Sequence, residues 1–142
     1  MARELPSPEL QAWAIGFPVT LLHAAVTLLI LACGTGLYVL ITPHREVQLI
    51  REGNPAAALS LGGMIVALAT PLAVSMAAST SLVGLALWGV ATLFVQLTTF
   101  RLTDLMFRGL PQRISEGEVG AAVIAVSAKL ATALILSAAV AA

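Results

Sequence analysis

The stretch Glu52-Gly53-Asn54-Pro55-Ala56-Ala57-Ala58 decides the fold, because it leads from a charged loop straight into a run without charged residues. A related stretch, Glu116-Gly117-Glu118-Val119-Gly120-Ala121-Ala122, follows 64 positions later. Each stretch has a long apolar segment before its loop and another after it. We therefore interpret the chain as two copies of one unit, in which a short charged loop joins two apolar helices.

The composition places the chain in a lipid bilayer. Of its 142 residues, 59% are hydrophobic and 10% are charged, whereas about a quarter of the residues of soluble domains are charged. Seven basic residues balance seven acidic ones, so the net charge does not indicate a nucleic-acid partner. The single cysteine, Cys33, excludes an internal disulfide and a cysteine-built metal site. We expect no cofactor and no metal.

The apolar segments predict an all-α membrane protein with four transmembrane helices. The runs without Asp, Glu, Lys or Arg at residues 10–43 and 53–100 are longer than the roughly 20 residues that span a hydrocarbon core. The predicted helices cover about residues 17–41, 55–78, 82–107 and 119–140. Residues 1–16 are a tail, expected either to fray or to form a short interfacial helix that starts at Ser7 and Pro8. The first two-helix repeat then covers 17–78 and the second 79–142.

The distribution of positive charge predicts the orientation. Arg3 stands alone on one side of the predicted spans. The other side holds five arginines, namely Arg45, Arg51, Arg101, Arg108 and Arg113. The positive-inside rule then places both polar loops in the cytoplasm and both termini outside. Because each unit has two spans, the units have the same orientation and form parallel repeats, related by a pseudo-two-fold axis along the membrane normal.

The residues of the two loops resemble a known family. Thr42-Pro43-His44, then Gln48-Leu49-Ile50, then Gly53 to Ala58, with Ile114-Ser115-Glu116-Gly117 in the second copy, are similar to the YjfL-like family of small bacterial inner-membrane proteins, a domain of unknown function numbered 350. The resemblance extends over residues 22–139. It implies a four-helix protein of the bacterial inner membrane and no particular activity. Glu118 departs from the family pattern, which has Asn there.

Lys129 is the intramembrane residue with the greatest need of a partner. It lies about eleven residues into the last helix, roughly 16 Å from its start. A lysine at a helix centre costs about 2.5 to 3.5 kcal/mol on insertion scales, so Lys129 should face other helices or water. We expect it to point to Gln96 or to an internal water. A direct salt bridge to Asp104 is not expected, since Asp104 lies about ten residues away in depth.

His23 and a charged stripe are further candidates. His23 lies in the first helix and is expected to form a hydrogen bond to another helix, with proton relay as the alternative. Arg101, Asp104 and Arg108 follow one another at spacings of three and four residues, which predicts a charged stripe on one helix face at the cytoplasmic end.

The two loop stretches are predicted to be hinges at which the second and fourth helices begin. Their residues are Glu52, Gly53, Asn54 and Pro55 in the first, and Glu116, Gly117 and Glu118 in the second. Free N–H groups at helix starts favour anions. The carboxylates already present are expected to cap these helices, with an ion or headgroup site as the alternative.

These features favour a non-enzymatic function. The sequence contains no phosphate-binding glycine loop, no HExxH motif and no set of nucleophile, base and orienting residue. Two functions remain: a helix-packing oligomer or interaction module, and a small ion or proton conduit that uses polar residues around Lys129. Small residues spaced four apart, such as Ala58 and Gly62 or Gly63 and Ala67, favour close helix packing. The expected partners are the bilayer and either copies of the chain or another membrane protein.

Overall fold

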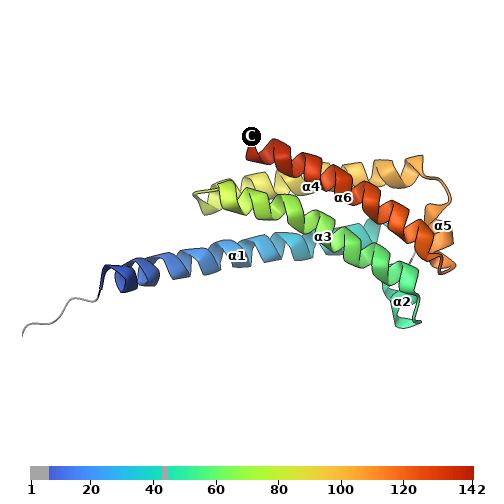
Figure 1. Cartoon of the computed structure of the whole chain (residues 1–142), viewed down its shortest axis with the longest axis horizontal. Coiled ribbons are helices and arrows are strands. Elements are labelled where there is room, and N and C mark those ends of the chain that lie inside the picture. Colours follow the sequence, from blue (N-terminus) through green and yellow to red (C-terminus); the bar gives the residue numbers. More distant parts are fainter. Residues whose placement is uncertain (1–6, 43–44) are drawn as a thin grey trace, which may run out of the picture.

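Figure 1 shows the computed structural model of the protein, in which residues 7–42 and 45–142 are described. These residues form helices and turns, and no strand occurs among them. The predictions that involve Arg3, Pro43 and His44 lie outside the described residues. The elements in chain order are α1 (Pro8–Ile41), α2 (Glu46–Arg51), α3 (Pro55–Ala78), α4 (Leu82–Met106), α5 (Leu110–Ser115) and α6 (Val119–Ala141).

Four of these helices, α1, α3, α4 and α6, are long and apolar enough to cross a membrane. The all-α membrane fold with four spans is therefore confirmed. The predicted bounds of α3, α4 and α6 agree with the structure to within one residue at each end. The short helices α2 and α5 were not predicted. They lie in the two polar loops, where six residues are too few for a pattern of apolar positions to show.

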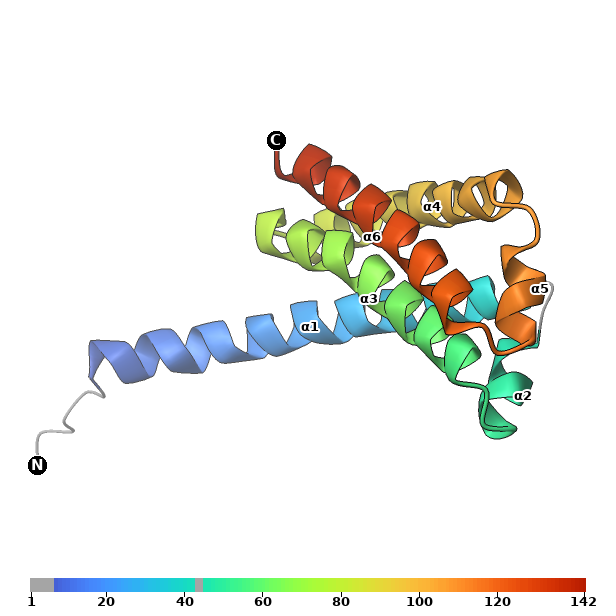
Figure 2. The same ribbon diagram turned by 45° about the vertical axis from the view of Figure 1, so that its right-hand side comes forward.

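α1 is a single long helix rather than a tail followed by a span. It starts as predicted at Ser7, whose side chain accepts a hydrogen bond from the Leu10 N–H at 3.5 Å, with Pro8 as the first helical residue. Its 34 residues correspond to about 51 Å. In the most apolar window of α1, 11% of the residues are buried, compared with 39% in α3. The N-terminal half projects from the other helices (Figures 1 and 2).

α3 and α6 form the most closely packed pair and run side by side in the same direction (Figure 2). Gly63 permits this approach, because a Cβ atom there would lie 2.4 Å from Cγ1 of Val126. Its neighbour Gly62 lies on the outside, where a Cβ atom would meet nothing within 4 Å. The predicted small pair of Ala58 and Gly62 therefore faces away from α6, and both residues are exposed. α1 and α4 run the opposite way and pack against α3.

The turns before α3 and α6 have the same backbone path. Gly53 and Gly117 both have φ of +87°, in the left-handed region that glycine adopts at low cost. Their N–H groups donate to the carbonyls of Ile50 and Ile114, at 3.0 Å in each case. The duplication and its two-fold axis stay predictions, but the turns can be compared position by position at a 64-residue offset. We call the end of the bundle that carries α2 and α5 the turn end.

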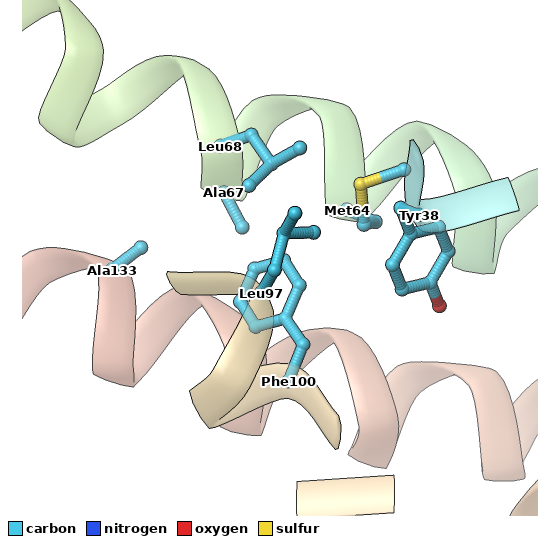
Figure 3. Close-up of a cluster of buried hydrophobic side chains, with 7 residues drawn as sticks. All are labelled: Tyr38, Met64, Ala67, Leu68, Leu97, Phe100 and Ala133. Atoms are coloured by element: carbon cyan, nitrogen blue, oxygen red, sulfur yellow. The ribbon is translucent and has the colours of Figure 1, made fainter. Parts of the chain in front are cut away.

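A cluster of buried side chains fills the space between the four long helices (Figure 3). Tyr38 lies at one end of this cluster, and its hydroxyl points away from Met64. The cluster consists of Tyr38 from α1, Met64, Ala67 and Leu68 from α3, Leu97 and Phe100 from α4, and Ala133 from α6. Every long helix contributes to it, so this cluster positions the polar groups next to it.

Candidate functional site

Lys129 lies inside the bundle and joins three helices. Its residue is 2% exposed, which confirms that it faces other helices rather than lipid. The ammonium nitrogen Nζ donates to the Tyr38 hydroxyl of α1 at 2.7 Å. It also lies 3.1 Å from Oδ1 of Asp104 on α4, whose side chain is 16% exposed. We call Tyr38, Asp104 and Lys129 the buried charge cluster.

The expectation that Lys129 and Asp104 lie too far apart for a salt bridge was wrong. It considered depth alone and ignored the direction of the side chains. Cα–Cβ bonds tilt toward the N-terminus of their helix. Because α6 begins at the turn end, Lys129 leans toward that end. Because α4 finishes there, Asp104 leans away from it, so the two side chains converge.

Two aromatic rings enclose the ammonium group. Nζ lies 4.8 Å from the centre of the Tyr38 ring and 5.5 Å from that of Phe100. The rings meet edge to face, with their centres 6.2 Å apart. A cation near the face of an aromatic ring gains electrostatic energy, most of all where water is excluded. An ion pair, a hydrogen bond and two aromatic rings therefore replace the water molecules that would hydrate the ammonium group of Lys129 in solution.

Gln96 does not serve as the partner of Lys129, contrary to the prediction. Its Nε2 donates to the Ala67 carbonyl of α3 at 3.4 Å. Its Oε1 is buried and accepts no hydrogen bond from any described residue. Gln96, Phe100 and Asp104 succeed one another every four residues and so share one face of α4. Phe100 therefore lies between Gln96 and the charged pair on this face.

A second buried polar contact, at the turn end, was not predicted from the sequence. Glu46, the first residue of α2, is 1% exposed. Its Oε1 accepts a hydrogen bond from Ser60 of α3 at 3.0 Å. At the 64-residue offset the same positions hold Leu110 and Ile124. That replacement of a polar pair by an apolar pair is the signal that could have revealed an inward-facing glutamate.

Tyr38 was missed for a different reason. It is the single tyrosine of the chain and lies three residues before the end of α1. The intramembrane polar residues predicted from the sequence were Lys129, Gln96 and His23, and the phenol of Tyr38 was not among them. Placing Tyr38 at the depth of Asp104 would have needed only the predicted end of the helix at Ile41.

The predicted charged stripe does not form a common face. Asp104 is half-buried and turned toward Lys129, whereas Arg101 and Arg108 are exposed. Arg108 also follows the end of α4 at Met106, so the helical spacing no longer applies to it. Asp104 thus belongs to the buried charge cluster, and the two arginines belong to the surface.

His23 bonds within its own helix rather than to another one. Its Nδ1 lies 2.8 Å from the Val19 carbonyl. A carbonyl oxygen accepts and cannot donate, so Nδ1 carries the proton and Nε2 is left for other contacts. His23 lines an open cleft of about 440 Å³, together with Val19, Thr20, Met76, Ser79 and Thr80. The cleft lies between α1 and the far end of α3, at the opposite end of the bundle from α2 and α5.

Asn54 is the residue that joins the two turns. Its Oδ1 accepts from the Ala57 N–H at 3.0 Å and so caps α3. Its Nδ2 donates to the carbonyls of Ile114 and Ser115, at 3.1 and 3.0 Å. Ile114 and Ser115 are the last two residues of α5. The Asn54 side chain therefore forms hydrogen bonds with backbone groups in both halves of the chain.

The glutamates of the turns do not cap the long helices, contrary to the prediction. Glu52 and Glu116 each accept a hydrogen bond from the glutamine four residues earlier, at 2.9 Å. Glu118 precedes α6 but makes no side-chain cap bond. It forms an ion pair with Arg113 instead. The hydrogen bond from Arg113 lowers the pKa of the Glu118 carboxyl below its ordinary value.

The polar side chains at the centre of the bundle include a buried ion pair between Lys129 and Asp104. Among residues 7–42 and 45–142, no three His, Cys, Asp or Glu side chains come together as metal ligands.

A sequence comparison shows the family of the chain. The family model described as Domain of Unknown Function (DUF350) matches residues 12–140, which is nearly the whole chain. The chain belongs to this family.

Two curated relatives agree with this family. Inner membrane protein YjfL of Escherichia coli strain K12 and the protein of the same name from Escherichia coli O157:H7 are each 32% identical to this chain over 95 residues. The match covers 67% of this chain and 72% of each relative. No solved structure matches the chain significantly. The resemblance drawn from the loops is confirmed, and the protein is a multi-pass inner-membrane protein in contact with lipid.

Proposed function

We propose that the protein is a non-enzymatic helix-packing module that associates with a second copy through the projecting half of α1. The observation that carries this proposal is a polar and small-residue stripe on that half. Gly16, Thr20 and His23 follow one another at spacings of four and three residues, so they share one face of α1. A Cβ atom at Gly16 would meet nothing within 4 Å.

The exposure of apolar side chains on α1 does not support this proposal by itself, since lipid is as apolar as leucine. Small residues such as Gly16 are different, because they let helices approach closely. The Thr20 hydroxyl donates to the Gly16 carbonyl of its own helix at 3.1 Å, so its oxygen is left to accept a bond from another helix. Part of this stripe lines the 440 Å³ cleft opposite Met76, Ser79 and Thr80. Nε2 of His23 offers a further hydrogen bond there. A helix from a second copy would fill the cleft and satisfy that group.

Cysteine cross-linking tests the proposed contact. In a Cys33→Ser background, Thr20→Cys should form a disulfide-linked dimer on mild oxidation in native membranes. Phe94→Cys is the matched control, because Phe94 is 72% exposed on α4 and lies away from the stripe. A dimer with Thr20→Cys and none with Phe94→Cys supports the proposal. Equal cross-linking at both positions, or none at Thr20, would contradict it.

We propose proton conduction as the second candidate function. The buried charge cluster and the unbonded Oε1 of Gln96 favour it, because intramembrane ionisable groups often mark proton pathways. Lys129, Gln96 and Phe100 are all 2% exposed or less, which favours a sealed interior. Dissipation of a pH gradient in proteoliposomes distinguishes the two functions. Proton flux that Lys129→Ile abolishes would favour conduction and count against a purely structural role for the cluster.

A further inference from the structure

A cavity of about 470 Å³ lies at the turn end, where α1 meets α2. It is a different place from the buried charge cluster and from the cleft at His23. Its lining combines apolar side chains with arginines, and the lining residues are Val39, Thr42, Arg45, Glu46, Val47, Gln48 and Arg51. Val39 lies two residues before the end of the α1 span, so the cavity lies at the level where apolar chain gives way to polar loop.

The two arginines of this cavity have little else to bind. Nη1 of Arg45 donates to Oε1 of Gln48 at 3.3 Å, a bond to a neutral amide. Within residues 7–42 and 45–142, Arg51 has no ion-pair or hydrogen-bond partner. Glu46 also lines the cavity, but its carboxylate is directed to Ser60 and the residue is 1% exposed. Among the described lining residues, two guanidinium groups and one carboxylate leave a formal charge of +1.

The second turn provides an internal contrast. At the 64-residue offset, the positions of Arg45 and Arg51 hold Gly109 and Ser115. The arginine of that turn, Arg113, is already paired with Glu118. The backbone path of the turn therefore forms without arginines at these two positions. The presence of Arg45 and Arg51 around one cavity needs another explanation.

We propose that Arg45 and Arg51 bind a phosphate group, supplied by the phosphodiester of an anionic phospholipid. Guanidinium groups bind phosphate oxygens through paired, charge-assisted hydrogen bonds. Basic pockets at the ends of transmembrane helices bind lipid headgroups. Val39 and Val47 supply apolar surface against which the start of an acyl chain packs. Free inorganic phosphate shares this chemistry, so the test separates the two sources.

The experiment compares lipid binding by two double variants with the same change of charge. Native mass spectrometry of detergent-solubilised protein measures the occupancy of phosphatidylglycerol relative to phosphatidylcholine. Wild type should prefer phosphatidylglycerol. Arg45→Gln with Arg51→Gln should lower that preference on the order of tenfold, as expected for the loss of one or two charged hydrogen bonds. Arg101→Gln with Arg108→Gln removes two exposed arginines at the same end and should leave it unchanged.

A second measurement identifies the source of the phosphate. Sodium phosphate is added to lipid-depleted wild type, with sodium chloride at equal ionic strength as the control, and the unfolding temperature is measured. A shift specific to phosphate and absent from the first double variant assigns the site to free phosphate rather than lipid. A preference for phosphatidylglycerol equal in wild type and in both double variants, with no such shift, overturns the proposal.

The substitutions are chosen so that folding does not decide the result. Arg45 and Arg51 are exposed, and helical content by circular dichroism should stay at the wild-type value. If the double variant fails to fold, Arg51→Gln alone replaces it, because the Arg51 side chain bonds to no described residue. An unchanged lipid preference in that folded single variant, with no phosphate-specific shift in the unfolding temperature of wild type, would equally overturn the proposal.

Discussion

The two turns of this protein have one backbone path and two different sets of side chains. Both place a glycine at φ of +87° and repeat the same backbone hydrogen bonds 64 residues apart. The first turn has an inward-facing Glu46 and a bridging Asn54, whereas the second has Leu110 and Glu118 at those positions. The path of the turn therefore depends on its backbone hydrogen bonds and its glycine, whereas a buried polar group depends on the side chain at one single position.

The long helices differ in the same way. Lys129 of α6 and Asp104 of α4 correspond at the 64-residue offset to Ile65 and Leu40. One half of the chain therefore supplies both ionised groups of the cluster, and the other half supplies Tyr38 to hold them. Of these two residues of the first half, Ile65 packs against the buried cluster, whereas Leu40 is 82% exposed.

The largest loss of stability is expected when Lys129 is replaced by isoleucine, the residue at the corresponding position of the first half. Lys129→Ile should lower the free energy of unfolding by about 3 kcal/mol, because Asp104 is left inside the bundle without its partner. Adding Asp104→Leu should restore most of the loss, because two apolar residues replace a buried pair at little cost. The free energies of unfolding of wild type, Lys129→Ile, Asp104→Leu and the double variant are measured in a denaturing detergent and form a double-mutant cycle. A double variant no more stable than Lys129→Ile would contradict the pairing.

The next effect compares two adjacent glycines of α3. Gly63→Ala should cost about 1 to 3 kcal/mol, because the new Cβ atom would lie 2.4 Å from Val126 Cγ1. Gly62→Ala is the matched control and should be neutral or slightly stabilising, since alanine is the better helix former. Thermal unfolding of both variants measures the difference. Similar losses at the two positions would show that α3 and α6 do not meet at Gly63.

The third prediction exchanges the residues that distinguish the turns. Asn54→Ala should cost about 1 to 2 kcal/mol, because α3 loses its cap and two carbonyls lose their donor. Glu118→Ala should cost far less, since Glu118 makes no cap bond and its ion pair is exposed. Urea or detergent unfolding midpoints separate the two variants. A Glu118→Ala loss as large as that of Asn54→Ala would mean that the turns share their side-chain chemistry after all.

The smallest effect concerns pH. The hydrogen bond from Arg113 lowers the pKa of Glu118 in the folded protein below the ordinary value of about 4.3. The stability that it contributes is fully present above that ordinary value and is lost as the pH falls through the lowered pKa. Because both groups are exposed, the loss should be slight. The unfolding midpoint is measured from about pH 6 downward. Arg113→Gln should reduce the fall of this midpoint with decreasing pH, because Glu118 then has no arginine partner.

The four membrane-spanning helices were predictable from the sequence because each span is a long apolar run bounded by Pro, Ser or charged residues. Glycine at positions 53 and 117 also marked the turns. The partner of Lys129 was not predictable from depth alone, because it depends on side-chain direction in antiparallel helices and on how they cross. Glu46 was equally hidden, since a charged loop residue normally faces water and only the packing of α2 on α3 turns it inward.

The bridging role of Asn54 shows a further limit. Its capping bond is local and could have been inferred from its position before Pro55, since Asn is a strong N-cap residue. Capping was instead predicted for the glutamates, and the cap formed by Asn54 was not predicted. The bonds to Ile114 and Ser115 join residues about sixty positions apart, and no local pattern encodes them. They follow from the parallel packing of α3 and α6.

Proton flux through wild-type protein in liposomes distinguishes most directly between a buried charge cluster that holds helices together, as the helix-packing proposal requires, and one that conducts protons. A pH-sensitive dye is trapped inside, an outward pH gradient is imposed, and its decay is compared with that in protein-free liposomes. Helix packing without conduction predicts equal decay for wild type, for the Lys129→Ile and Asp104→Leu double variant, and for empty liposomes. Faster decay in wild type that the double variant abolishes would contradict it.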